Sequence, residues 1–487
     1  MLFRSDVVRA HRQANGALDL YVADIKASHH ERTEHRIQVA TYAHLLRQMA
    51  EEADLPVGVV KVAVLHRDDE EGFASFGAES TFDLTTYMTV LQHLVTNPDS
   101  SLERVDRAAF DAIAYHPGYE CDGCLYNALC FYDSAERLDL SLVPYLTATE
   151  KRVLQENGVG DVAALANLLA LPDTGQDLTV TPGAEAVVEK LGNAWPVNAR
   201  LPLLVQRARR ALKRFAPETA SHTFLLGSGF GTLPADDEHP GLVKIFFDAQ
   251  HDYLRDHIYL LAALVCGPGG SVPVTGMLSA PPTLASEQKL LTTWVQRVLD
   301  AVARVTDQPA APVHFYCYNS YDQRMLLEAL KRHLDAVSLL PGFFDLMTQN
   351  PAVNQPIISF LAKEVEERRN LGTVCAPLHD VARMLGFDWA QEGVPFYQHF
   401  RARLFDNRRD VVRDAGGRLH HAGDDVPRGD PRRITIESAS RFNSQIPLEY
   451  AYAAWGELSD SADRRTVQPF LGTTRELLIQ FASARVR

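Results

Sequence analysis

A carboxylate and an ammonium group stand two residues apart in the segment LYVADIKAS, which covers residues 20–28. Its alternating pattern predicts a β-strand, in which Asp24 and Lys26 project from the same face with the carbonyl of Ile25 between them. A carboxylate can hold Mg²⁺ or Mn²⁺, and a nearby lysine can help to generate hydroxide and offset phosphate charge. The pattern therefore indicates metal-dependent phosphodiester hydrolysis, with an exposed ion pair at a strand end as the structural alternative.

Two further features strengthen this interpretation. Asp6 opens an apolar run that is expected to pair with residues 18–25 as a hairpin, and it would supply a second carboxylate. Gln38 and Tyr42 stand four residues apart on a predicted helix over residues 33–53. A glutamine on the buried side of a helix needs a partner, so Gln38 either bonds within the core or faces the metal site.

The residues named so far resemble, in type and order, the core motifs of RecB-like PD-(D/E)xK nucleases: Asp6, Asp24, Lys26, Gln38 and Tyr42. The resemblance implies a restriction-endonuclease-like α/β core that cleaves DNA, with Asp6 and Asp24 as metal ligands. It also implies that Lys26 positions the attacking water, and that Gln38 and Tyr42 support the site and the DNA. The helix that usually precedes this core would lie before the first residue, so the chain is expected to be truncated there.

Three of the six cysteines lie within ten residues, as Cys121, Cys124 and Cys130. Thiolates at this C-x2-C-x5-C spacing can hold zinc or an iron–sulfur cluster, and His116 could complete a zinc site. The position of the cysteines resembles the C-terminal cysteine set of iron–sulfur RecB-like nucleases, which implies a 4Fe-4S cluster with Zn²⁺ as the alternative. In that family a fourth cysteine precedes the core, and none precedes Cys121, as the expected truncation would explain.

Residues 136–216 have helical periodicity throughout and predict a small helical module. Gly158 and Gly160 separate two predicted helices, either at an ordinary corner or in a helix-hairpin-helix-like form that brings backbone N–H groups to a DNA phosphate. Six basic residues and no acidic residue follow in the interval 200–215: Arg200, Arg207, Arg209, Arg210, Lys213 and Arg214. They predict a track for the phosphate backbone of DNA, with a solvated helix face as the alternative.

A second α/β region is expected over residues 240–405. Asp248 is expected at the end of a buried strand, and Asp322 follows a later strand within the pattern Asn-x-x-Asp. Carboxylates at strand ends suit two-metal phosphodiester chemistry. The two motifs resemble the YprB-like branch of RNase H-like DEDD exonucleases, although Gln250 stands where the first motif has an acidic ligand, and Asp252 is the nearest substitute. A degenerate domain that binds DNA or serves as a scaffold is expected, with 3′–5′ exonuclease activity as the alternative.

The C-terminal segment, residues 430–487, contains a stretch at 440–455 that is similar to the junction region of RecB-like nuclease and helicase fusions. The chain has no Walker A pattern, so the resemblance implies a superfamily 1 helicase as a partner that is either fused in a longer form or separate. The expected domains are a nuclease with the cysteine cluster (1–135), a helical module (136–216), an RNase H-like domain (240–405) and the C-terminal segment (430–487).

The composition sets limits on this interpretation. A length of 487 residues fits about three domains of roughly 150 residues each. The longest apolar run, 258–266, is far shorter than the ~20 residues that span a bilayer, so a cytoplasmic protein without a membrane partner is expected. The net charge of −14 argues against nucleic-acid binding over the whole surface but allows a local basic track.

Together the motifs predict a multidomain α/β protein that acts as a metal-dependent DNA nuclease in repair, recombination or foreign-DNA processing. The alternative from another functional class is a catalytically inactive nucleic-acid-binding platform for a helicase.

Overall fold

The computed structural model divides into two compact units, Met1–Ala114 with Tyr253–Asp256, and Tyr115–Asp252 with His257–Arg487. It describes the whole chain except for the following residues: 1–6, 27–31, 67–77, 109–112, 114, 119–120, 122–126, 172–177, 228–232, 236, 307, 309–310, 336–337, 349–356, 375, 390, 392–408, 414, 416–418, 424–425, 428, 437–444 and 459–471. Within the described ranges, no helix combines the length and the apolar character that a bilayer crossing needs.

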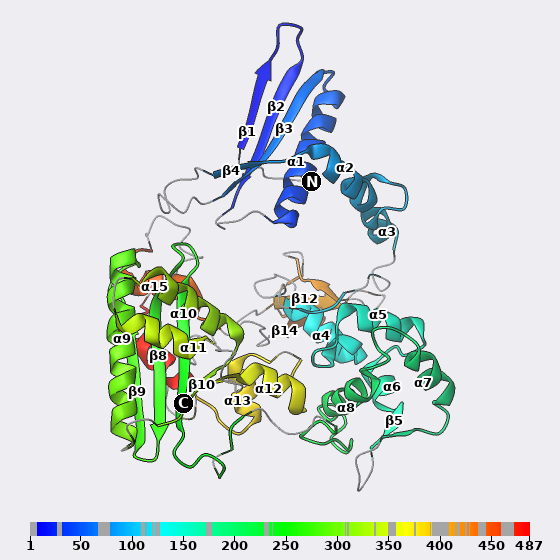
Figure 1. The fold of residues 1–487 in the computed structure, drawn as a ribbon. Helices are drawn as coiled ribbons and strands as arrows, with labels where there is room; N and C mark the ends of the chain where they lie inside the picture. The colour runs from blue at the N-terminus through cyan, green and yellow to red at the C-terminus, as the bar shows by residue number, and fades with distance from the viewer. Residues whose placement is uncertain are drawn as a thin grey trace. The chain divides into compact units, whose positions relative to one another are not determined.

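The first unit is built on a four-stranded sheet with the order β1-β2-β3-β4 (Figure 1). β1 and β2 form the predicted hairpin, β2 and β3 are parallel, and β4 returns antiparallel to β3. The strands and helices of this unit have the following bounds: β1 (Val7–Arg12), β2 (Leu18–Ile25), α1 (Thr33–Glu52), β3 (Val57–His66), β4 (Ala78–Thr81), α2 (Leu84–Leu91), η2 (Gln92–Thr96) and α3 (Ser101–Arg107).

Helix α1 is the crossover that joins the parallel strands β2 and β3, and it packs on one face of the sheet. Alternation along β2 turns Val22 toward this helix, where it packs with Val62 and Val64 of β3 and with Val39 and Ala43 of α1. Because Asp24 follows Val22 on the same face, the local pattern carries its carboxylate toward α1.

The second unit begins with a helical part that has its own apolar core. Its elements have these bounds: α4 (Asn127–Arg137), η5 (Leu140–Leu142), α5 (Ala148–Glu156), α6 (Val162–Ala166), β5 (Leu169–Ala170), β6 (Thr179–Val180), α7 (Glu185–Gly192) and α8 (Leu201–Leu212). Tyr115 is bonded to this part, since Lys151 Nζ donates hydrogen bonds to the carbonyl of Tyr115 and to Asp139 Oδ1, both at 2.7 Å.

The rest of the second unit is built on a five-stranded sheet with the order β11-β10-β7-β8-β9. β7, β8 and β9 form an antiparallel meander, whereas β10 and β11 run parallel to β7. The sheet and its helices have these bounds: β7 (Val243–Asp252), β8 (His257–Gly267), β9 (Gly270–Met277), α9 (Leu284–Val305), β10 (Val313–Cys317), α10 (Ser320–Arg332), α11 (Leu339–Met347), β11 (Ile358–Phe360), α12 (Leu361–Arg368) and α13 (Leu378–Met384).

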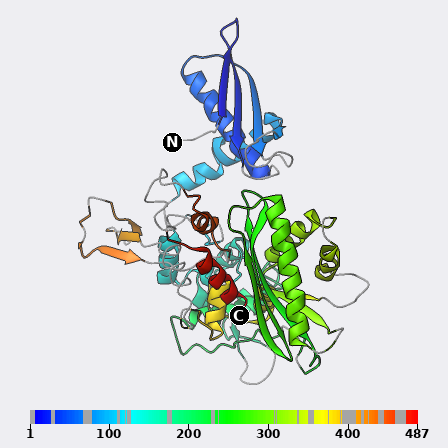
Figure 2. The ribbon, with the colours of Figure 1, turned by 90° about the vertical axis from the view of Figure 1, so that its left-hand side faces the viewer.

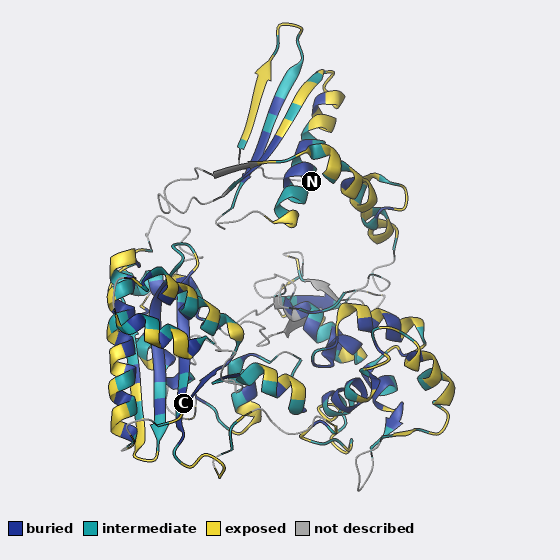
Figure 3. Cartoon of the chain, viewed as in Figure 1, coloured by how far each residue is buried: buried dark blue, intermediate teal, exposed yellow. Residues whose placement is uncertain are grey.

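Both faces of this sheet are covered, as the burial of β7 and β8 in Figure 3 shows. α9 packs on one face, and α17 (Arg475–Arg485) lies on the other side of the sheet (Figure 2). α15 (Leu448–Trp455) joins α17 there, with the ring of Trp455 packed edge-on against Tyr259 at 5.4 Å between centroids. A small sheet of β12 (Arg409–Arg413), β13 (Leu419–His421) and β14 (Arg433–Ile436) precedes α15.

Candidate functional site

The C-terminal end of β2 carries the first candidate site. Asp24 is 3% exposed, and its Oδ2 atom lies 2.5 Å from Nζ of Lys26. The backbone N–H of Lys26 donates to the carbonyl of Leu65 at 2.8 Å, which fixes this strand end to β3. The buried carboxylate and the partly exposed ammonium therefore share one face of β2, and the pair is not an exposed surface contact.

Helix α1 adds two polar side chains to this pair. Gln38 Oε1 accepts a hydrogen bond from Lys26 Nζ at 2.7 Å, and Gln38 Nε2 donates to the hydroxyl oxygen of Tyr42 at 2.5 Å. Of the two roles open for Gln38, the geometry favours the one that faces the site, because its amide bonds to Lys26. The four side chains form one continuous chain of contacts from the strand to the helix.

The arrangement leaves Lys26 able to act on a substrate. An ammonium group has three N–H donors, of which Gln38 accepts one, and the carboxylate of Asp24 forms an ion pair with the group. The side chain is 23% exposed, so another N–H can reach a water molecule or a phosphate oxygen. The two fixed contacts hold the ammonium in place and reduce the reorganisation that the reaction would require.

His35 is a further residue near this site that sequence reasoning missed. It lies one turn before Gln38 on α1, and its Nδ1 accepts the backbone N–H of Arg32 at 3.3 Å, so a neutral imidazole carries its proton on Nε2. Desolvation, followed by the nearby charge of Lys26, lowers the pKa of His35. The lowered pKa favours a neutral imidazole at pH 7. In the sequence, the i, i+3 spacing of His35 and Gln38 was the pattern that could have indicated that both lie on the same side of the helix.

Substituting Gln38 tests the role of the helix. Gln38→Ala removes the group that accepts from the Lys26 ammonium, so we expect the phosphodiester hydrolysis predicted from the sequence to slow by about 10–100-fold without loss of the fold. Tyr42→Phe removes only the acceptor for the Gln38 amide, so its effect should be smaller. Single-turnover cleavage rates measure both, with Gln48→Ala, an exposed glutamine on the same helix, as the matched control. Equal rates for Gln38→Ala and Gln48→Ala would contradict this role.

A divalent cation is compatible with the donor chemistry at Asp24, since a carboxylate oxygen is the ligand that Mg²⁺ and Mn²⁺ prefer. The second predicted ligand, Asp6, lies outside the described residues. In the described ranges, no three His, Cys, Asp or Glu side chains come close enough together to hold a metal ion. Asp24 is therefore the described carboxylate that would hold the cation.

Two of the three predicted cluster cysteines are described, and both are half-buried. Cys121 Sγ accepts the backbone N–H of Gly118 at 3.4 Å, and Cys130 lies on α4. Cys124 falls outside the described residues. His116, the candidate fourth zinc ligand, is half-buried, and desolvation lowers its pKa, which favours the neutral imidazole that binds metals.

The two glycines of the predicted helix-hairpin-helix-like form are exposed, but the helix that follows them is already capped. Gly158 has a φ of +85° and ends the turn after α5, and Gly160 precedes α6. At the start of α6, Asp161 accepts the backbone N–H of Ala164 at 2.7 Å, so a carboxylate already caps this helix.

The basic run on α8 divides between buried and exposed side chains. Arg207 is 2% exposed and donates to the carbonyls of Pro144 and Glu366, so it is engaged in packing within the unit. Arg209 donates to the carbonyls of Ala166 and Leu169 at 3.0 and 2.9 Å. Arg210 is half-buried, whereas Lys213 and Arg214 are exposed, and Arg214 Nη1 donates to the carbonyl of Gly372 at 3.0 Å.

The second predicted set of carboxylates is brought together in the five-stranded part. Asp248, Gln250 and Asp252 alternate on one face of β7, and Asp322 of α10 joins them. Burial, and after it the negative charge of Asp248, raises the pKa of Asp322. This cluster belongs to the second unit, as does each of its partners.

The comparisons with known proteins concern the N-terminal part of the chain. No curated protein and no solved structure matches the chain at a significant level. A family model described as the PD-(D/E)XK nuclease superfamily matches residues 4–131, the interval that contains the Asp24, Lys26 and Gln38 site. Residues 4–131 therefore carry a PD-(D/E)XK nuclease superfamily domain, and members of that superfamily are typically metal-dependent nucleases.

Proposed function

We propose that the chain is a metal-dependent DNA nuclease of the RecB-like type, which hydrolyses phosphodiester bonds in DNA repair, recombination or foreign-DNA processing. The observation that carries the proposal is the continuous contact chain from Asp24 through Lys26 and Gln38 to Tyr42, within the interval matched by the superfamily. A buried carboxylate and an oriented ammonium on one face suit the hydrolysis of a phosphodiester bond.

In this mechanism Asp24, with Asp6 as the second proposed ligand, would hold Mg²⁺ or Mn²⁺. When bound, the cation would lower the pKa of a water molecule that it binds and would neutralise charge on the phosphate. The Lys26 ammonium donates an N–H to the attacking water or to a phosphate oxygen. Gln38 holds that ammonium through its amide oxygen, and Tyr42 holds the amide through its hydroxyl oxygen.

The finer assignments remain part of the proposal. They include a 4Fe-4S cluster, or Zn²⁺, at the three cysteines 121, 124 and 130, and DNA contacts from Lys213 and Arg214. The exposure of these two basic residues supports the contacts. An RNase H-like identity for residues 240–405 is supported by the strand order of the five-stranded sheet. In that sheet β8 is antiparallel to its neighbours β7 and β9, whereas β10 and β11 lie beyond β7 and run parallel to it. A superfamily 1 helicase is the proposed protein partner.

A cleavage assay tests the function itself. End-labelled single-stranded and duplex DNA are incubated with the full chain and Mg²⁺ or Mn²⁺, and a parallel sample contains EDTA. We expect cleavage that depends on the cation and stops in EDTA. A folded protein that cuts neither substrate with either cation would contradict the proposal and favour the inactive platform.

A further inference from the structure

The carboxylate cluster of the second unit is buried to an unusual degree. Asp248, Gln250, Asp252 and Asp322 are 4%, 1%, 0% and 1% exposed. Removing ionised carboxylates from water is costly unless hydrogen bonds or an opposite charge compensate. The partners of these side chains therefore decide whether the cluster can hold a metal ion.

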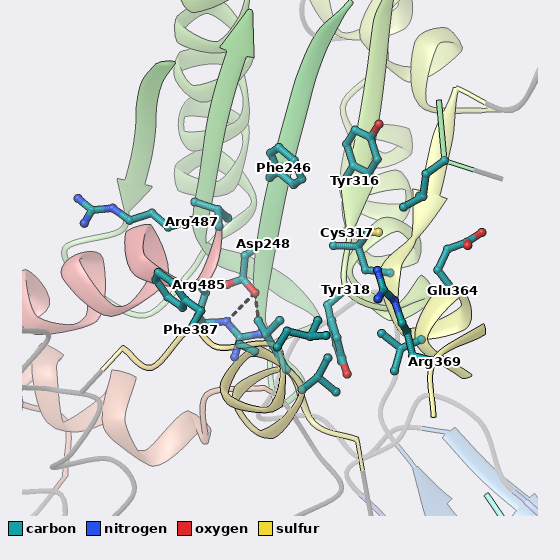
Figure 4. Close-up of a pocket in the computed structure, with 18 of the residues that line it drawn as sticks. Phe246, Asp248, Tyr316, Cys317, Tyr318, Glu364, Arg369, Phe387, Arg485 and Arg487 are labelled. Carbon is teal, nitrogen blue, oxygen red and sulfur yellow. Dashed lines mark hydrogen bonds and ion pairs between the residues drawn. The ribbon is translucent and has the colours of Figure 1, made fainter. Parts of the chain in front are cut away.

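Every member of the cluster has a partner in the C-terminal part of the chain. The Nε and Nη2 atoms of Arg485 on α17 both lie 2.8 Å from Asp248 Oδ1, and Figure 4 shows the guanidinium beside that carboxylate. The other three contacts are made by residues 445–452: Gln445 Nε2 to Asp322 Oδ1 at 2.6 Å, the backbone N–H of Ile446 to Gln250 Oε1 at 2.9 Å, and Tyr452 Oη to Asp252 Oδ2 at 3.0 Å.

The contacts of Asp248 use both oxygens that a metal ion would need there, whereas Oδ2 of Asp322 is buried with no hydrogen-bond partner among the described residues. Asp248 Oδ1 faces Arg485, and Asp248 Oδ2 accepts a hydrogen bond from Gln250 Nε2 at 2.8 Å. The Arg485 side chain is 6% exposed, so its positive charge is itself buried against the carboxylate. A divalent cation beside Asp248 would have to displace the guanidinium, because two cations cannot share the position.

The charge balance of the cluster points the same way. Burial, followed by the charge of Asp248, raises the pKa of Asp322, which favours its neutral form. Asp248 is then balanced by Arg485, Gln250 adds no charge, and Asp252 adds one carboxylate that accepts a hydrogen bond from the hydroxyl of Tyr452. The cluster lacks the excess of negative charge that a pair of divalent cations requires. The residues present therefore do not fit the two metal ions that an RNase H-like exonuclease would use.

We infer that this cluster is an anchor for the C-terminal segment, in which Arg485 takes the position of a metal cation. The anchor joins β7 and α10 to residues more than a hundred positions later in the chain, so residues 445–452 and α17 form part of the core of this unit. The five-stranded domain is a non-catalytic part of the protein, and its exonuclease alternative does not apply. This inference is independent of the nuclease proposed for the first unit.

A pair of arginine substitutions tests the anchor. Both are made in the full chain with Asp24→Asn, which removes the proposed metal ligand of the first unit. Arg485→Met leaves Asp248 buried without its cation, so we expect the melting temperature to fall by roughly 5–10 °C. Mn²⁺ should then raise the melting temperature, because a metal cation can replace the lost guanidinium. Arg487→Met, an exposed arginine that points away from the carboxylate in Figure 4, should cause neither change.

Two results would overturn the inference. The first is equal stability of Arg485→Met and Arg487→Met. The second is a rise in melting temperature with Mn²⁺ when Arg485 is intact, if Asp248→Asn removes that rise. Should Arg485→Met fail to fold, the combination Arg485→Met with Asp248→Asn removes both charges and should restore folding; a double variant that also fails to fold would contradict the anchor.

Discussion

Lys26→Ala is expected to slow metal-dependent DNA cleavage by about 10²–10⁴-fold. The ammonium is paired with Asp24 and donates a hydrogen bond to Gln38, and its exposed side can donate to the reacting water or phosphate. Its loss removes both the charge and the donor from the transition state. Single-turnover cleavage of a labelled oligonucleotide at saturating Mg²⁺ measures the effect separately from substrate binding.

The control for this substitution is Lys61→Ala, which removes an exposed lysine from the neighbouring strand β3. Because Lys26→Ala leaves the buried Asp24 without its ion pair, thermal unfolding of each variant is recorded alongside the rates. Lys26→Met keeps the aliphatic packing and serves as the second variant if Lys26→Ala unfolds. A folded Lys26 variant that cuts as fast as Lys61→Ala would show that the ammonium takes no part in the reaction.

Glu287→Ala is expected to destabilise the second unit by about 3–5 kcal/mol. The carboxylate is 0% exposed, accepts the backbone N–H of Ile258 at 2.7 Å, and is bonded to Arg332 at 2.8 Å and His333 at 3.0 Å. Its loss leaves an arginine, a histidine and a backbone donor without their acceptor. Urea unfolding, followed by circular dichroism, measures the change in the free energy of unfolding.

Glu328→Ala is the matched control, because Glu328 is an exposed glutamate on α10, the helix that leads to Arg332 and His333. Glu287→Gln keeps an acceptor for the Ile258 N–H and loses the charge, so its cost should fall between the two alanine variants. If Glu287→Ala unfolds at the same urea concentration as Glu328→Ala, the buried carboxylate does not hold α9, α10 and β8 together.

Local sequence pattern was sufficient to predict the geometry of the first site. Alternation in β2 puts Asp24 and Lys26 on one face, and the amphipathic pattern of α1 puts Gln38 and Tyr42 on the side that packs on the sheet. All four residues lie within 19 positions of the sequence, and a single strand and a single helix position them. The pattern therefore predicted that these four side chains could meet; it did not indicate His35, and Asp6 lies outside the described residues.

The second cluster depends on contacts that no local pattern encodes. Arg485 and Asp248 are 237 residues apart, and Gln445 and Asp322 are 123 residues apart. The sequence identified the absence of an acidic residue at Gln250, but it could not show which cation balances Asp248. Arg207 is a similar case, because a run of basic residues does not reveal that one guanidinium turns into the core.

Asp24→Asn tests the central proposal most directly. The substitution keeps the size of the side chain and removes the charge that would hold Mg²⁺ or Mn²⁺. The measurement compares cleavage of single-stranded and duplex DNA by the wild-type chain and by Asp24→Asn over a Mn²⁺ titration, with thermal unfolding as the check on folding. We predict Mn²⁺-dependent cleavage by the wild type and none above background by Asp24→Asn. Equal cleavage by the two proteins at every Mn²⁺ concentration would contradict a nuclease site at Asp24.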